Sequence, residues 1–375
     1  MKTPENKEVL KYFDQNFLNK ATNYNKSILL NSVFQKFTTW LFLGLIIFLI
    51  WKNNYFSNKI SIIAALIIFF IFSIILILIN LPFQYYQEFI IEHKFALSNQ
   101  TFSAWIIDTL KDSSLSIIIN TISLTSIYAI ILYIPKYWWF AAAAVFILFI
   151  IIANFIFPIL IDPLFYKFTP LKDNQLKQEI LKITTTAGID VKAILVADAS
   201  KKTNKVNAYI TGIGKTKRIV IYDNLLNNYS KKEVLSVIAH EVGHWKYKHI
   251  LINIFIQAIA IILLFLILFL MQLNLNIGVS AKLIILFFIF TILISFIVSP
   301  LQNSISRYFE KQADITSLAL TKDPDTQILM FEKLAKSNLS DVNPNKIIKY
   351  IIYTHPPILE RITNAYNYKM QNNLN

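Results

Sequence analysis

The sequence predicts a mainly α-helical, polytopic membrane protein that also has a small α+β domain outside the lipid. Hydrophobic residues make up 55% of the 375 residues, and the mean hydropathy is +0.51. Charged residues make up only 15%, whereas soluble globular domains have about 25%. A more polar region in the middle of the chain combines short β-branched runs with helical periodicity, which is typical of an α+β domain.

Six segments are apolar and long enough to cross a bilayer, which requires about 20 residues. The first segment contains Lys36, whose long side chain can reach the membrane interface. Only Lys136 separates the third and fourth segments, so we expect them to form a tight helical hairpin. The six segments are Val33–Trp51, Ile60–Phe83, Ser113–Pro135, Tyr137–Ile161, Ile250–Met271 and Leu283–Asn303.

The distribution of basic residues predicts the orientation of the chain. Six spans place both termini on one side, together with the segments 84–112 and 162–249. Of the 36 Lys and Arg residues, 32 fall on that side and 4 on the other. Because basic residues accumulate on the cytoplasmic side, we expect both termini and the large loop to be cytoplasmic. The net charge of +14 is then explained by basic cytoplasmic loops of a protein embedded in a lipid bilayer. We therefore expect no nucleic-acid partner.

The spans divide the chain into five regions. These are a cytoplasmic N-terminal segment (1–32), the first four transmembrane helices (33–161), a cytoplasmic domain (162–249), the fifth and sixth transmembrane helices (250–303) and a cytoplasmic helical tail (304–375).

The cytoplasmic domain contains one helical and three strand-like patterns. Lys172–Ala187 has helical periodicity, whereas Ala193–Ala197, Val206–Ile210 and Arg218–Tyr222 have strand composition. Residues 211–215 are predicted to form a hairpin turn between the last two strands. The capping-box pattern from Ser230 to Glu233 then starts a helix, which we expect to continue into the fifth span.

That helix contains an H-E-x-x-H motif. His240 and His244 lie four residues apart and so share one helix face, where both imidazoles can bind one Zn²⁺. Glu241 lies beside them and can act as a general base on a water molecule. The chain has no cysteine, so any zinc must be held by His and Asp or Glu.

A catalytic zinc requires a third protein ligand, and Glu310 is the candidate. Glu310 and Asp314 lie one helical turn apart, so Glu310 can bind the metal while Asp314 accepts a hydrogen bond from a ligating imidazole. The sixth span returns the chain to the side where the fifth begins, and this brings Glu310 to the same membrane face as His240 and His244. The motif therefore predicts a zinc hydrolase near the cytoplasmic face, with one zinc per chain.

Several motifs, in the same order along the chain, resemble those of the type I CaaX prenyl endopeptidases. These sterile-24-type membrane zinc proteases belong to the gluzincin class, and the resemblance covers roughly residues 84–365. It is carried by Asp162–Phe165, Phe168–Leu171, Asn207–Tyr209, Lys217–Val220, His240–Trp245, Ser306–Asp314, His355–Pro357 and Glu360–Arg361.

The resemblance implies a ring of transmembrane helices around a water-filled chamber. It assigns the zinc ligands to His240, His244 and Glu310, and the catalytic glutamate to Glu241. It also places Asn207 and His355 in contact with the substrate or the developing oxyanion, and we therefore treat both as catalytic candidates. Hydrolysis of a peptide bond needs such a donor for its oxyanion, and Asn207 lies in a predicted edge strand, to which a substrate backbone could add.

The implied reaction removes the C-terminal tripeptide from prenylated CaaX substrates. We expect a multi-pass protein of the inner membrane in a bacterium, or of the endoplasmic reticulum in a eukaryote. The chain departs from the family in two places. Six spans are visible where the family has seven, and Lys202–Val206 stands where the family has Ser and His.

Two other functions and two side chains stay open at this stage. A heat-shock-type quality-control zinc protease would share the metal motif, and a non-enzymatic transporter or scaffold would carry it incidentally. Arg361 could pair with a structural carboxylate or with the carboxylate of the substrate. His249, at the start of the fifth span, is interpreted as an interfacial side chain.

Overall fold

The computed structural model describes residues 11–52, 58–212 and 217–372. The long helices are α2 (Gln15–Lys52), α3 (Ile62–Gln84), α5 (Phe102–Tyr133), α6 (Trp138–Leu160), α11 (His249–Leu275) and α12 (Ala281–Thr321). The shorter helices are η2 (Tyr85–Ile91), α4 (Glu92–Lys94), α7 (Asp162–Phe165), α8 (Asn174–Thr186), η3 (Ala199–Lys201), α9 (Asp223–Asn228), α10 (Lys231–Lys246), α13 (Pro324–Asn338), α14 (Lys346–Ile352) and α15 (Ile358–Gln371).

The prediction of six transmembrane helices is confirmed. Within the described ranges, six helices are long and apolar enough to cross a membrane, and they are the six long helices named above. Several extend beyond the predicted limits. α2 starts at Gln15, inside the predicted N-terminal segment, and the predicted loop 84–112 is largely helical. The difference arises because hydropathy marks only the part of a helix that lies in lipid, whereas backbone hydrogen bonding continues into water.

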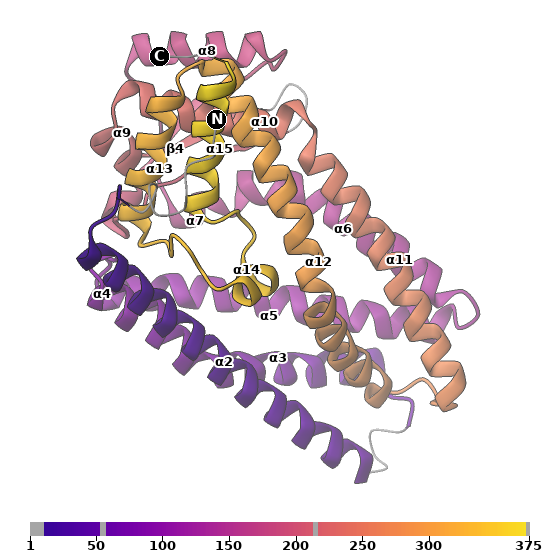
Figure 1. Cartoon of the computed structure of the whole chain (residues 1–375). Helices are drawn as coiled ribbons and strands as arrows, with labels where there is room; N and C mark the ends of the chain where they lie inside the picture. Colours follow the sequence, from indigo (N-terminus) through magenta and orange to yellow (C-terminus); the bar gives the residue numbers. More distant parts are fainter. Residues whose placement is uncertain (1–10, 53–57, 213–216, 373–375) are drawn as a thin grey trace.

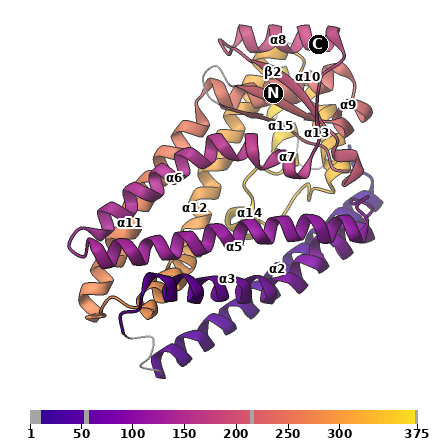
Figure 2. The ribbon, with the colours of Figure 1, turned by 180° about the vertical axis from the view of Figure 1, so that it is seen from behind.

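The sheet and the short helices α8, α9, α10, α13 and α15 gather at one end of the molecule, and the long helices extend away from them (Figures 1 and 2). The sheet has the order β1-β2-β4-β3, from β1 (Phe168–Pro170), β2 (Ala193–Ala197), β3 (Ala208–Thr211) and β4 (Arg218–Tyr222). β2 and β4 are parallel, whereas β1–β2 and β3–β4 are antiparallel.

The three predicted strands are present, and β1 is additional. β3 lies at an edge of the sheet, with β4 as its neighbour. The antiparallel pairing of β3 and β4 agrees with the predicted hairpin, although residues 213–216 of its turn lie outside the described ranges.

Two hydrophobic clusters form the core, and α2 contributes to both. One cluster joins the sheet to α8, α10, α13 and α15, and Phe17, Ala21 and Tyr24 of α2 pack into it. The other lies among the long helices and includes Leu43 from further along α2. The helix α2 therefore connects the end of the molecule that contains the sheet to the membrane-spanning part.

α10 packs closely against α12. A Cβ added to Gly243 would lie 2.8 Å from the Cα of Ala313, so only glycine permits this approach. In the same helix–helix interface, the Ser317 hydroxyl of α12 donates a 2.8 Å hydrogen bond to the Ser236 carbonyl of α10. This packing aligns the two helices that carry the predicted metal ligands.

The expectation that the motif helix continues into the fifth span is wrong. α10 ends at Lys246 and α11 begins at His249. Between them, Lys248 adopts the left-handed conformation with φ of 56°, which interrupts the α-helical backbone and turns the chain. The predicted helix was wrong because the sequence here has neither the Gly nor the Pro that usually marks such a break.

A cavity of 1530 Å³ connects the two parts of the molecule. His240 and Glu241 of α10 line one region of its wall, whereas Trp40 of α2 and Phe296 of α12 line another. Trp40 and Phe296 belong to membrane-spanning helices, so the cavity extends from the motif to the membrane region. This agrees with the expected chamber enclosed by helices.

Candidate metal centre

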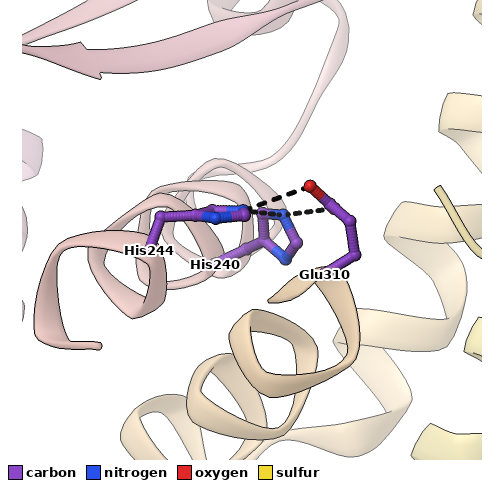
Figure 3. A group of neighbouring side chains, drawn as sticks. All are labelled: His240, His244 and Glu310. Carbon is purple, nitrogen blue, oxygen red and sulfur yellow. Dashed lines mark hydrogen bonds and ion pairs between the residues drawn. The ribbon is translucent and has the colours of Figure 1, made fainter. Parts of the chain in front are cut away.

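Three predicted ligands meet at the interface of α10 and α12. Nε2 of His240 lies 3.2 Å from Nε2 of His244, and Glu310 presents one carboxylate oxygen to each ring, at 3.2 and 3.3 Å. His240 and Glu310 are buried, and His244 is half-buried. Figure 3 shows the two imidazoles and the carboxylate converging on one point.

The donor atoms fit a tetrahedral metal ion. With metal–nitrogen bonds of about 2.0–2.1 Å, two ligands of a tetrahedral site are separated by about 3.3 Å. The two imidazole nitrogens are 3.2 Å apart, which matches this value, and each of them lies 3.2–3.3 Å from one of the two Glu310 carboxylate oxygens. In addition, Oε2 of Glu310 is buried and accepts no hydrogen bond, an arrangement that a metal ion would satisfy. Two imidazoles and one carboxylate are a donor set that suits zinc.

Asp314 lies behind His240, as the one-turn spacing predicted. The Nδ1 atom of His240 is 2.8 Å from Oδ1 of Asp314, so the other ring nitrogen is left for a metal. Asp314 in turn accepts two hydrogen bonds from Arg361, from Nε at 2.9 Å and from a terminal nitrogen at 2.6 Å. Arg361 of α15 therefore pairs with a structural carboxylate, and this answers the question that the sequence left open.

Glu241 directly follows the ligand His240 in α10 and lines the cavity. Burial raises the pKa of its carboxyl above the ordinary value, whereas the neighbouring His240 and His244 act in the opposite direction. A raised pKa brings a carboxylate closer to the range in which it exchanges protons near neutral pH.

Asn207 and His355 line the same cavity wall as Glu241. Asn207 immediately precedes the edge strand β3 and is exposed. His355 lies between α14 and α15, with Nε2 3.3 Å from Oε1 of Glu310. Partial desolvation of the imidazole by the atoms around it lowers its pKa, with Glu310 acting in the opposite direction. The structure thus places both side chains where a substrate in the cavity could meet them.

One contact of this centre was missed by sequence reasoning. His249 is only 2% exposed, and its ring lies against His244, so it is not the interfacial side chain that we expected. The spacing of five residues gave no signal, because residues i and i+5 lie on different faces of a continuous helix.

Comparisons with known proteins agree with this fold and with a membrane metalloprotease. The sequence model of Peptidase family M48 matches residues 170–369, and the model described as CAAX prenyl protease N-terminal, five membrane helices, matches residues 2–167. The uncharacterized metalloprotease YhfN of Bacillus subtilis is 33% identical over 79% of this chain and 72% of its own length. A CAAX prenyl protease 1 homolog of Arabidopsis thaliana is 34% identical over 76% of this chain and 69% of its own length.

A crystal structure of Ste24p from S. mikatae superimposes with a TM-score of 0.82 at 26% identity, covering 94% of this chain and 90% of that one. The fold and the H-E-x-x-H geometry define a multi-pass membrane metalloendopeptidase. The chain belongs to Peptidase family M48, whose metalloproteases use a metal that is generally zinc.

Proposed function

We propose that this protein is a zinc endopeptidase that removes the C-terminal tripeptide from prenylated CaaX substrates at a membrane. The observation that carries the proposal is the cluster of His240, His244 and Glu310, in which the imidazole nitrogens lie 3.2 Å apart and each lies 3.2–3.3 Å from a carboxylate oxygen. One Zn²⁺ per chain would bind these three residues, and it would supply a Lewis acid and a more acidic water. The alternatives of a heat-shock-type protease and of a transporter have no comparable support.

The side chains of this centre would then have separate roles in peptide hydrolysis. Glu241 takes a proton from the attacking water and delivers it to the leaving amine. Asn207 and His355 donate hydrogen bonds to the oxyanion that develops on the scissile carbonyl. The free edge of β3 pairs with the substrate backbone, so the carbonyl is held beside the centre. Asp314 fixes the orientation of His240.

The cavity supports a lipid-modified substrate. Its 1530 Å³ exceed the roughly 300–1,000 Å³ of ordinary small-molecule pockets, and its wall includes Trp40, Phe296 and Ile352. An isoprenyl chain could occupy the apolar region while the peptide reaches Glu241. The relative from Arabidopsis thaliana is named CAAX prenyl protease 1 homolog and one from Saccharomyces cerevisiae is named CAAX prenyl protease 1, which favours the same substrate class. The partners would be this substrate and the lipid bilayer, with no nucleic acid.

The basic residues favour a cytoplasmic catalytic end with cytoplasmic termini. The membrane would be the inner membrane of a bacterium or the endoplasmic reticulum of a eukaryote.

The test compares wild type with Glu241→Gln on a farnesylated CaaX peptide, with the unprenylated peptide and a misfolded membrane protein as further substrates. We expect wild type to release the tripeptide and Glu241→Gln to be slower by at least about 100-fold while retaining one zinc per chain. Preferential cleavage of the misfolded protein would favour the quality-control alternative. Absence of zinc from the purified protein would contradict the whole proposal.

A further inference from the structure

We infer that His249 is a positioning residue that fixes the ring orientation and the tautomer of His244, with Gln312 as its anchor. The inference rests on the proposed metal centre, and it assigns a role to a side chain outside the H-E-x-x-H motif. His249 contacts the ligand His244 and is not among the residues that line the cavity, so its effect would be on metal binding through His244.

The contacts of His249 hold its ring in one place. Nδ1 of His249 lies 3.0 Å from Nδ1 of His244, and Nε2 lies 3.0 Å from Oε1 of Gln312. The ring of Phe309 stacks on it at 4.2 Å with an interplanar angle of 11°, and Tyr247 stacks at 5.8 Å. Both nitrogens of a ring that is only 2% exposed therefore have a partner.

The hydrogen positions follow from the requirement that His244 bind a metal. Nε2 of His244 faces His240 and Glu310, so this atom must carry the free electron pair and the proton must lie on Nδ1. Nδ1 of His244 then donates to Nδ1 of His249. Because His249 accepts there, its own proton lies on Nε2, where it is donated to Oε1 of Gln312.

The orientation of Gln312, the last residue in this series of hydrogen bonds, agrees with this assignment. The amide nitrogen of Gln312 donates to the Tyr308 hydroxyl at 3.2 Å, so its oxygen is the atom that faces His249. The reverse direction of hydrogen bonding would place a proton on Nε2 of His244 and would exclude that nitrogen from binding a metal. Only one direction is therefore compatible with the metal centre.

The break between α10 and α11 creates this contact. Lys248, in the left-handed conformation, turns the chain so that His249, the first residue of α11, returns toward His244. α12 supplies the other side, because Phe309 and Gln312 flank Glu310 on that helix. Each imidazole ligand thus has its own partner, the carboxylate of Asp314 for His240 and the neutral ring of His249 for His244.

The test measures the rate at which zinc leaves the purified, full-length protein in the presence of an excess of a coloured chelator. His249→Phe retains an aromatic ring against Phe309 and removes the acceptor of the His244 proton. We expect zinc release about 10–100-fold faster than in wild type. His249→Asn can place its amide oxygen where Nδ1 lies, so we expect release much closer to wild type.

Two further variants separate the hydrogen bonds from folding. Gln312→Met leaves the His249 ring in place but removes its anchor, so release should be faster than in wild type and slower than in His249→Phe. Tyr247→Phe changes a stacking neighbour and should release zinc as wild type does. The thermal unfolding of the zinc-free proteins shows whether each variant folds.

The inference would be overturned if His249→Phe released zinc at the wild-type rate. It would also be overturned if His249→Asn and His249→Phe released zinc equally fast. Because zinc release requires no substrate, either result would leave the comparison of Glu241→Gln on the farnesylated peptide unaffected.

Discussion

Arg361 and Asp314 form a buried ion pair directly behind His240. Their exposed fractions are 9% and 1%, and two hydrogen bonds join them. Removing one partner leaves an uncompensated buried charge, which is far more costly than the loss of an exposed ion pair. At the scale of single residues, this pair stabilises the packing of α15 against α12 and also holds the orientation of His240.

We therefore expect Arg361→Met to lower the free energy of unfolding by about 3–5 kcal/mol. Arg361→Lys, which keeps the charge but not the paired hydrogen bonds, should lose less. Glu360→Gln is the control, because the exposed pair of Glu360 with Lys349 should contribute at most about 1 kcal/mol. Thermal unfolding of the zinc-free variants measures these differences, and an unchanged stability of Arg361→Met would show that the pair contributes little.

At the scale of elements, the contact between α10 and α12 determines whether the ligands meet. Gly243 permits the approach of α12, and a methyl group there would meet the backbone of Ala313 at 2.8 Å. Backbone atoms cannot move aside as a flexible side chain does, so the two helices would have to separate.

Gly243→Ala should destabilise the protein by about 1–3 kcal/mol despite the higher helix propensity of alanine. It should also weaken zinc binding, because the separation moves Glu310 away from the two imidazoles. Gly44→Ala is the matched control, since Gly44 is also helical but has no atom within 4 Å of the added Cβ. Similar melting temperatures for the two variants would contradict the packing argument.

The start of α10 is stabilised by a capping box. Ser230 accepts a hydrogen bond from the Glu233 amide, and the Glu233 carboxylate accepts one from the Ser230 amide at 2.7 Å. Lys333 of α13 lies 2.8 Å from the same carboxylate. Burial raises the pKa of Glu233, but these hydrogen bonds and Lys333 outweigh it, so the pKa lies below its ordinary value of 4.5.

A lowered pKa in the folded state means that Glu233 stabilises the protein above pH 4.5 and that this contribution is lost as the pH falls through the folded-state pKa. Glu233→Gln keeps an oxygen that can accept the hydrogen bond of the Ser230 amide but loses the charge that pairs with Lys333, so it should lower the free energy of unfolding at neutral pH by about 1 kcal/mol. The difference from wild type should shrink as the pH falls below 4.5. A difference that stays constant from neutral to acidic pH would contradict this account.

At the scale of the whole molecule, the charge bias predicts which end faces the cytoplasm. The orientation can be measured by thiol labelling, because the chain has no cysteine and a single introduced cysteine would be the only thiol to react. Lys177 of α8 and Asn58 before α3 are both exposed. The charge bias predicts that they lie on opposite sides of the membrane.

We expect a membrane-impermeant maleimide to label Asn58→Cys in intact cells, and to label Lys177→Cys only after permeabilisation. The denatured proteins should label equally, which controls for expression. Labelling of Lys177→Cys in intact cells would reverse the orientation.

The sequence predicted the membrane helices and the H-E-x-x-H face because both depend on local patterns. A run of about 20 apolar residues crosses lipid whatever lies beside it, and residues four apart share a helix face by backbone geometry alone. The same reasoning gave the strands Ala193–Ala197 and Arg218–Tyr222 with their observed limits. It missed β1, whose three residues include Pro170 and are too few to show a strand pattern.

Residue patterns by themselves thus determined that this chain has six helices able to cross a membrane and carries two imidazoles on one helix. Only the tertiary structure decided which side chains support them, the pairing of Arg361 with Asp314 and the contact of His249 with His244. Arg361 is 47 residues from Asp314, and the His249 contact depends on one left-handed backbone conformation at Lys248. Such contacts arise from how helices pack and turn, and a periodicity within one segment carries no information about them.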